Sequence, residues 1–587
     1  MFVSVRPRQL LAVLFAFALI ASACGGGSDD PVEDAGGSDA ADTDDTTTDS
    51  DGGATDTDTS GEGADESADG SDLVTEDPTA AQSGGTLRVG IEGEPDSLNP
   101  TSTAFAPGAI LMGTAIFDTL TAWSEDDLWV NNLTESWTPN DDFTSWDMKL
   151  RPGITFSDGE PLNADAVLRS VEAQVNDPLI GLIFIPVFDP ETPFEKVDDL
   201  TVRITPLGSN AVIPAYFATQ LGMIGSPAWL DARDVDPSLD QMPIGAGPFK
   251  IESRVQDSVT RLARNDGWWR DDQEIYLDAI EIFPNNQEGQ RADQLLLGDL
   301  DMNHSTDGDS AIRLRAEPSI KRIEDDSGEE FFFIFNTSSP PFDDIRVRQA
   351  ATHAFPREEY NELIDQNIPR VADSLFTPES RWFNPDVTQI VDQPELSGPL
   401  IEAYCADVPE SCTDGKVDIE YQYNGPSLSL DNTAAVMRNA WEPFFNIETQ
   451  VVPQDDFITE VATGQFDVTT YRTHGNVDPE IEFTFLSCSA ILGVFSLNWS
   501  RYCDPAREEL LLAQRNTADE AERIELWQQI SQSIADSYQY LITNHTNWIV
   551  SANENVNGVC DGTNVDGDTL QCSLNGAWRF PQIWLSQ

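Results

Sequence analysis

The segment Glu330-Phe-Phe-Phe-Ile-Phe-Asn-Thr-Ser-Ser-Pro-Pro-Phe-Asp-Asp344 organises the rest of the sequence. Its apolar run, Phe331 to Phe335, has the length of a strand buried on both faces and is short for a helix. The residues up to Pro341 predict a turn, because proline cannot donate to a strand ladder. Asp343 or Asp344 then caps a predicted helix from Ile345 to about Ala354. This segment lies near the middle of the folded part, so we interpret it as a crossing between two lobes.

The first 24 residues have the pattern of an export signal. Arg6 and Arg8 precede an apolar stretch, Leu10 to Ile20, which is too short to span a bilayer comfortably. Ala21-Ser-Ala-Cys24 resembles the lipobox of bacterial lipoproteins, which implies that Cys24 is lipidated and becomes the mature N-terminus. Cleavage without lipid is the alternative, because alanine occupies the usual leucine position.

Residues 25–83 contain 19 acidic residues and no Lys or Arg. A segment of this composition buries too little apolar surface to order itself, so we expect a disordered linker between membrane and domain. Subtracting these 19 acids and two signal arginines from the totals of 103 acids and 32 bases leaves 84 − 30, or 54 net negative charges. This charge argues against nucleic acid or an anionic membrane surface as a partner.

Six cysteines follow Cys24, and they form three pairs of near neighbours. Six cysteines allow fifteen pairings, but the clustering favours the sequential one in an oxidising compartment. We therefore expect the disulfides Cys405–Cys412, Cys488–Cys503 and Cys560–Cys572. A zinc site is disfavoured, because no pair has the Cys-x-x-Cys spacing and the chain has only four histidines. No metal or other cofactor is expected.

About 500 residues remain, which exceeds one hydrophobic core and implies two or three domains. Gly85 to Ile91 alternates like a strand and leads into a turn-rich loop. Residues from Trp146 to Val167 predict a strand, a Pro-Gly turn, a second strand, and a helix capped by Asn163. Val259 to Ala263 alternates as a further strand.

The order and spacing of several such pieces resemble the solute-binding proteins of ABC importers, in extracellular solute-binding protein family 5. That family includes oligopeptide, dipeptide and nickel receptors. The matching pieces are Gly84 to Leu87, Glu94 to Pro100, Phe117 to Leu120, Leu133 to Trp137, Trp146 to Val167, Gly245 to Phe249, Arg264 to Trp269, Val347 to Ala350 and Phe355 to Glu358.

The resemblance implies an α/β, two-lobed periplasmic-binding-protein-like fold (class II, large type with an inserted subdomain) that encloses ligand in the cleft between its lobes. The expected divisions are lobe I at 84–335, completed by about 548–587, an inserted subdomain at about 123–242, and lobe II at 336–547. The implied location is extracytoplasmic, lipid-anchored to the outer face of the cell membrane. The expected partners are a small-molecule or peptide ligand and ABC permease subunits, and the expected state is a monomer.

The second lobe alternates predicted strands and helices, which indicates a mixed α/β sheet with ligand bound beyond the strand ends. The predicted strands are Val417–Tyr423, Ile447–Val452 and Phe466–Tyr471. A helix is predicted from Thr433 to Phe444, and Thr517-Ala-Asp-Glu520 has the pattern of a capping box for another.

The loop from Tyr471 to Pro479 is a candidate ligand loop. In peptide receptors of the family, the corresponding loop carries a Trp near its start and an Asp, four residues before the Pro, that pairs with the ligand amine; here Tyr471 stands near the Trp position and Gly475 replaces the Asp. Arg472 could instead pair with a carboxylate or phosphate. The cleft candidates are Phe105, Asn336, Tyr471, Arg472, His474, Asn476 and Trp499. Each of the aromatic candidates could stack on a sugar or peptide plane or serve ordinary packing, and His474 suits a loop hydrogen bond better than a metal.

The leading hypothesis is a receptor that captures a small solute, most often a peptide in this family, and delivers it to a permease without chemistry. An oligosaccharide or another organic solute is the alternative ligand. A secreted hydrolase is the alternative of another class; the sequence has no Gly-x-Ser-x-Gly elbow and no His-Glu-x-x-His helix, but glycosidase carboxylate pairs stay open. A ligand sensor that reports to a signalling partner is a third class.

Overall fold

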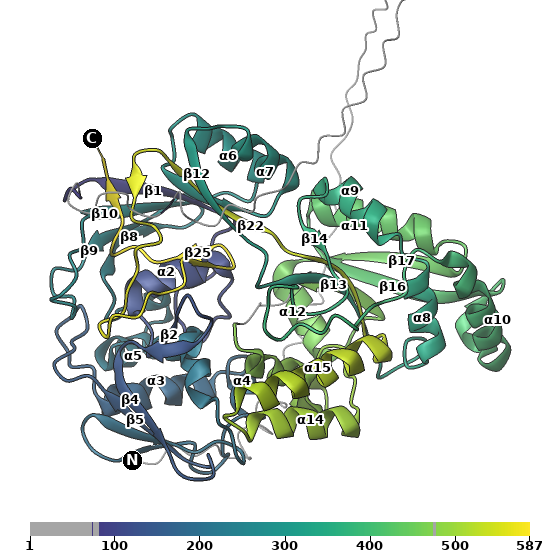
Figure 1. Cartoon of the computed structure of the whole chain (residues 1–587), viewed down its shortest axis with the longest axis horizontal. Helices are drawn as coiled ribbons and strands as arrows, with labels where there is room; N and C mark the ends of the chain where they lie inside the picture. Colours follow the sequence, from purple (N-terminus) through teal and green to yellow (C-terminus); the bar gives the residue numbers. More distant parts are fainter. Residues whose placement is uncertain (1–72, 74–80, 473–476, 587) are drawn as a thin grey trace, which may run out of the picture. The chain divides into compact units, whose positions relative to one another are not determined.

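The computed structural model describes residues 73, 81–472 and 477–586. Two seven-stranded sheets organise these residues (Figure 1). The first sheet contains, in spatial order, β12 (Ile320–Asp325), β22 (Trp548–Asn553), β11 (Met302–Ser305), β1 (Thr86–Ile91), β10 (Ala279–Pro284), β9 (Val259–Arg264) and β8 (Phe249–Val255).

Helices cover both faces of the first sheet. Leu87 and Val89 of β1 enter a core shared with α2 (Pro107–Phe117) and α5 (Pro227–Arg233). The opposite face packs against α6 (Glu288–Leu296) and α7 (Gly308–Arg315). Gly90 lies on that side, where a Cβ atom would come within 2.6 Å of Leu300.

The second sheet has the order β14 (Arg370–Val371), β21 (Tyr540–His545), β13 (Glu330–Phe335), β18 (Val468–Arg472), β16 (Lys416–Asn424) and β15 (Cys412–Thr413), with β17 (Phe445–Val452) also paired to β16. One face packs against α8 (Ile345–His353), α9 (Arg357–Asp365), α10 (Ser397–Asp407) and α11 (Leu428–Trp441). The other packs against α12 (Gln454–Thr463), α14 (Pro505–Arg515) and α15 (Glu520–Ser537).

The apolar run of β13 serves both of these cores. Phe333 and Phe335 enter the core with α8 and α11, whereas Phe332 and Ile334 enter the core with α12 and α15. The predicted strand buried on both faces is therefore confirmed. Asp344 caps α8 by accepting a hydrogen bond from Arg346 N, as the sequence also predicted.

The position of the lobe boundary differs from the sequence-based expectation. β13 pairs with β21 and β18 throughout, so it belongs to the second sheet and is not the crossing. The crossing segments are residues 326–329, between β12 and β13, and residues 546–547, between β21 and β22. The physical reason is that an apolar run buried on both faces needs cover on both faces, which an interior strand receives and a crossing does not.

A third, four-stranded sheet lies within the range expected for the inserted subdomain. Its order is β4 (Thr134–Pro139), β5 (Trp146–Leu150), β7 (Thr201–Ile204) and β6 (Phe194–Lys196). It shares a core with α3 (Ala164–Asn176), α4 (Gly181–Phe184) and the 3-10 helix η3 (Ile213–Ala218). Asn163 caps α3, as predicted. The second strand expected after the Pro-Gly turn is only an isolated bridge, Thr155 to Pro161.

Smaller elements complete the first lobe. β2 (Thr121–Trp123) pairs with β3 (Trp129–Asn131), and after β22 the chain forms two further pairs, β23 (Val556–Asn557) with β26 (Trp584–Leu585) and β24 (Ser573–Leu574) with β25 (Ala577–Trp578). The 3-10 helices η4 (Gln220–Gly222) and η5 (Pro237–Gln241) lie near α5 in the sequence. Leu73, inside the range expected to be linker, is buried in the core of the first sheet.

The remaining elements of the second lobe are short. They are η6 (Pro394–Leu396), η7 (Pro409–Ser411), η8 (Pro479–Glu482), α13 (Phe483–Leu486), η9 (Cys488–Ala490), β19 (Ile491–Leu492) and β20 (Phe495–Ser496). The cap of α15 is Asp519, which accepts from Glu522 N, and not the predicted Thr517 box. Asp519 is the better cap here because Thr517 Oγ1 is engaged by Asp519 N and by Glu522.

Three disulfides are present in the structure, Cys405–Cys412, Cys488–Cys503 and Cys560–Cys572. They join the cysteines that are neighbours in the sequence, which is the pairing expected above. Among the described residues, no helix combines the length and apolar character that a membrane crossing requires.

Truncating β13 tests its role as the shared strand of two cores. Phe333 is fully buried, so Phe333→Ala should lower the free energy of unfolding of the second lobe by about 3–5 kcal/mol. The measurement is thermal or urea unfolding followed by tryptophan fluorescence. Val235→Ala, at a side chain 86% exposed, is the control and should change stability by no more than about 0.5 kcal/mol. Equal effects of the two variants would contradict the assignment.

Candidate binding cleft

The carboxyl ends of strands from both sheets face each other. β1 runs parallel to β10 and β11 in the first sheet, and β16 runs parallel to β17 and β18 in the second. Glu92 directly follows β1, and Arg472 ends β18. The Arg472 Nη2 and Glu92 Oε2 atoms lie 3.4 Å apart. Ligands of open α/β sheets bind beyond such strand ends, so this contact marks the candidate site.

We call the residues around this contact the floor cluster, which consists of Glu92, His304, Thr306, Glu329, Arg472 and Trp548. Arg472 lies at its centre. Its Nη1 is 3.4 Å from Thr306 Oγ1, and its Nε is 3.6 Å from Glu329 Oε2. Its guanidinium also lies 5.0 Å from the centre of the Trp548 ring, a cation–π distance. The side chains of Arg472 and Glu92 are 30% and 21% exposed, so the pair is open to solvent although it lies between two sheets.

His304 holds the backbone of Glu92 in place. Its Nε2 accepts a hydrogen bond from Glu92 N at 3.0 Å, and its Nδ1 lies 2.8 Å from the carbonyl oxygen of Gly576. This pattern assigns the neutral tautomer with the proton on Nδ1. Burial lowers the pKa of His304, which agrees with a neutral ring at pH 7. His304 therefore acts as a fixed support of the cluster and carries no charge.

Glu329 comes from the first crossing segment and also contacts the second. Its carboxylate accepts a hydrogen bond from Trp548 Nε1 at 3.0 Å, and its backbone carbonyl accepts from Thr546 N at 2.6 Å. Burial raises the pKa of Glu329 to about 7, although Arg472 acts in the opposite direction. The side chain is almost inaccessible to solvent. Its charge therefore changes in the neutral range.

The other two charged groups of the floor cluster stay ionised. Burial acts to raise the pKa of Glu92, but the positive charge of Arg472 outweighs it and the pKa is lowered. Burial acts to lower the pKa of Arg472, but Glu92 and Glu329 outweigh it and the pKa is raised. The cluster thus holds one cation and two carboxyl groups, one of which titrates near pH 7.

The structure brings three of the sequence-predicted site residues together. Arg472 is in the floor cluster, and the neighbouring Tyr471 meets Trp499 with ring centres 4.7 Å apart in an edge-on arrangement. Both rings are half-buried against the core with α12 and α15. His474 and Asn476 lie outside the described residues, as does Cys24.

Phe105 and Asn336 are engaged in other contacts. Phe105 is buried in the core of the first sheet. Asn336 follows β13, which runs antiparallel to β18, so it lies at the opposite end of β18 from Arg472. Its amide donates to the carbonyl oxygens of Gly464 and Phe466, an arrangement that fixes a turn. We therefore do not include either residue in the site.

Sequence analysis missed Glu92, His304, Glu329 and Trp548. Glu92 could have been found, because it is the first residue after a predicted strand, where ligands of α/β sheets bind. Glu329 precedes the apolar run of β13 and could have been noted as an acid at a crossing. His304 and Trp548 carry no local signal, because only the pairing of β11 with β22 brings them beside β1.

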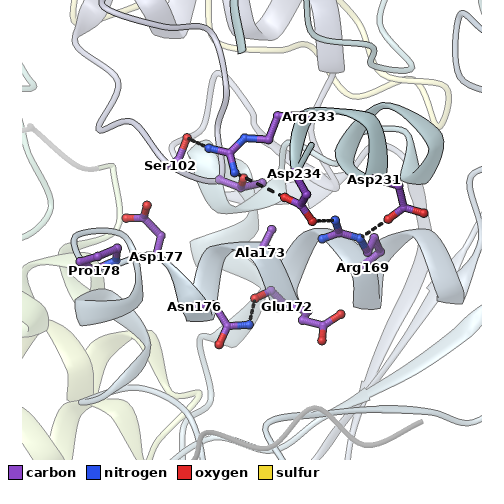
Figure 2. Close-up of a pocket in the computed structure, with 11 residues that line it drawn as sticks. Ser102, Arg169, Glu172, Ala173, Asn176, Asp177, Pro178, Asp231, Arg233 and Asp234 are labelled. Atoms are coloured by element: carbon purple, nitrogen blue, oxygen red, sulfur yellow. Dashed lines mark hydrogen bonds and ion pairs between the residues drawn. The ribbon is translucent and has the colours of Figure 1, made fainter. Parts of the chain in front are cut away.

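A cavity of about 440 Å³ lies elsewhere, between α3 and α5 (Figure 2). Both arginines of its lining are paired with aspartates of the same lining: Arg169 Nε lies 2.9 Å from Asp231, and Arg233 Nη1 lies 3.4 Å from Asp234. None of its lining residues belongs to the floor cluster, so we do not assign it the ligand. In the described ranges, no three His, Cys, Asp or Glu side chains are grouped closely enough to hold a metal ion.

Two sheets joined by two crossing segments, with polar strand ends facing each other, define a two-lobed solute-binding protein. The chain belongs to the bacterial extracellular solute-binding proteins, family 5, whose model, described as family 5 Middle, matches residues 129–490. Proteins of this family are extracytoplasmic binding proteins and not enzymes, which removes the hydrolase alternative.

Relatives and solved structures agree with this assignment. The chain is 24% identical over 513 residues to the dipeptide-binding protein of Escherichia coli, covering 83% of this chain and 94% of the relative. An ABC transporter-associated periplasmic binding protein from Helicobacter pylori, in complex with the peptide STSA, has a TM-score of 0.74 at 19% identity and covers 86% and 99% of the chains. A binding protein from A. tumefaciens R10, in complex with agropinic acid, has a TM-score of 0.73 at 18% identity with the same coverage.

The titration of Glu329 should be visible in stability. Because its folded pKa, about 7, exceeds the ordinary value of 4.5, the folded state binds the proton more tightly between these values. The contribution of Glu329 to the free energy of unfolding is therefore full below pH 4.5 and is lost as pH rises to about 7, by on the order of 2–3 kcal/mol. We expect urea unfolding across this pH range to show this loss of stability in the unmodified protein and not in Glu329→Gln. Parallel pH profiles would contradict the assignment.

Proposed function

We propose that this protein captures peptides outside the cytoplasm and delivers them to the permease of an ABC importer. Family membership and the peptide-binding relatives support the solute class. Capture needs no chemistry: the ligand binds the closed form better than the open form and so shifts the population toward closure. The carboxyl ends of β1 and β18 are where the ligand is expected.

The chemistry of the floor cluster supports a ligand with an amino group. Arg472 is already faced by Glu92 and Glu329, so it is not free to recognise a ligand carboxylate or phosphate. The cluster has more carboxylate than guanidinium charge, and Glu92 is both ionised and partly exposed. The acid missing at Gly475 therefore has a substitute in Glu92, which comes from the first lobe. This carboxylate is the observation that carries the proposal.

Binding of free and blocked peptides tests this proposal. Di- and tripeptides with a free N-terminus should raise the melting temperature, since a ligand at 100 times its dissociation constant contributes about 2.7 kcal/mol. N-acetylated peptides of the same sequence should bind at least about tenfold more weakly, because a hydrogen bond to a charged group is lost. Calorimetry measures both. A thermal shift with oligosaccharides or sugar acids alone would move the assignment to another organic solute.

The role of Glu92 is tested by substitution. Glu92→Gln should reduce the affinity for free peptides about tenfold and should remove most of the difference between free and acetylated forms. Glu395→Gln, at an exposed position of the second lobe, is the matched control and should leave both affinities unchanged. If Glu92→Gln still binds acetylated peptides more weakly than free ones, another residue binds the ligand's amino group.

We also propose that Cys24 is lipidated and that the acidic segment 25–83 tethers the binding domain to the membrane. The support is the sequence Ala21-Ser-Ala-Cys24. A single acyl chain gives only marginal binding, whereas two or three hold stably. Cys24→Ser should abolish incorporation of labelled palmitate and release the protein from membranes. Retention of label in the variant would disprove the anchor.

The transport role has its own test: cells that lack this receptor should lose peptide uptake through the importer.

A further inference from the structure

Glu480 lies at a second contact between the lobes and touches none of the floor cluster. It is in η8 of the second lobe and is fully buried. Its Oε1 accepts hydrogen bonds from Asn210 Nδ2 and Tyr216 OH, each at 2.9 Å. Asn210 and Tyr216 belong to the inserted subdomain of the first lobe and are also buried. One carboxylate thus joins two side chains of the opposite lobe.

The second lobe neutralises this carboxylate itself. Arg515 Nε lies 3.0 Å from Glu480 Oε1, and Gln514 Nε2 lies 2.5 Å from Oε2. Arg515 also packs over the Phe483 ring at 3.6 Å. Burial acts to lower the pKa of Arg515, but Glu480 outweighs it and the pKa is raised. Arg515 therefore stays charged, and both members of this ion pair come from the second lobe.

Backbone and apolar contacts surround the carboxylate. Ala211 N donates to the carbonyl oxygen of Arg515 at 2.6 Å, and Arg515 Nη1 donates to that of Pro186 at 3.4 Å. Pro186 follows α4, and Arg515 ends α14 (Figure 1). Val477 and Ile481 of the second lobe pack against a cluster of Trp123, Val212 and Ala215 in the first. These contacts exclude water from the Glu480 hydrogen bonds.

We propose that Asn210, Tyr216, Glu480 and Arg515 form a latch that sets how tightly the protein closes, and hence its ligand affinity, without contacting the ligand. When the lobes separate, Glu480 and Arg515 remain paired within the second lobe. Asn210 and Tyr216 lose their partner, so their hydrogen bonds to Glu480 exist only in the closed form. A contact found only in the closed form shifts the population toward closure, and apparent affinity follows that population. Only the expected effect on ligand affinity rests on the proposed capture function; the expected effect on lobe closure does not.

Two substitutions on the first-lobe side test the latch. Tyr216→Phe removes one hydroxyl and leaves the Glu480–Arg515 pair intact. The dissociation constant of the full-length protein for a peptide that it binds should rise about tenfold, and for Asn210→Ala with Tyr216→Phe about a hundredfold. The increase should lie in the dissociation rate, with the association rate unchanged. In small-angle scattering without ligand, the double variant should have a larger radius of gyration than the unmodified protein.

Tyr360→Phe is the matched control. Tyr360 is also buried, but its hydroxyl lies 3.3 Å from Thr433 within the second lobe, so its loss should change neither affinity nor radius of gyration. A double variant with unchanged affinity and unchanged radius of gyration would overturn the latch. If no peptide binds the unmodified protein, the proposed ligand class fails, and the scattering comparison still decides on the latch. An affinity loss matched by Tyr360→Phe would mean a general packing effect and would also overturn it.

Discussion

Everything in this structure depends on the two places where the chain crosses between its sheets. Residues 326–329 lead from β12 to β13, and residues 546–547 lead from β21 to β22. β12 pairs with β22 on one side and β13 pairs with β21 on the other, so the crossings run beside each other. Thr546 N donates to the Glu329 carbonyl oxygen and ties them together. Two short segments of this kind permit rotation of one lobe against the other and keep the strand ends in register.

Burying ionic groups at this crossing costs desolvation free energy, and ion pairs with arginine offset that cost. Glu329 is buried where the lobes meet and would be costly without Arg472 and the Trp548 indole. The same solution recurs at the latch, where Arg515 neutralises Glu480, and within the first lobe, where Arg254 pairs with Glu94. Arginine suits these places because its planar group donates several hydrogen bonds at once. Part of the scarce positive charge is therefore buried, and acidic residues predominate among the charges that remain.

What could be predicted from the sequence was local. The two-sided burial of β13, the Asp344 cap of α8 and the Asn163 cap of α3 follow from residues a few positions apart, and all three are present. The sequence-based lobe boundary is wrong, because the apolar run is an interior strand of the second sheet and the polar residues just before it form the crossing. The floor cluster could not be assembled, because Glu92, Glu329 and Arg472 are separated by more than a hundred residues each. Only strand order brings them together.

Recognition and closure are linked through one short part of the second lobe. Arg472 contacts Glu92 of the first lobe at the end of β18. A few residues later, Val477, Glu480 and Ile481 contact the inserted subdomain. The first contact lies near the start of the candidate ligand loop, and the second lies at its end. A change at one contact therefore alters the energy of the same lobe rotation as a change at the other. Ligand affinity in such a protein depends on both contacts. The free energy of closing has one contribution from the ligand at the floor cluster and another from the latch.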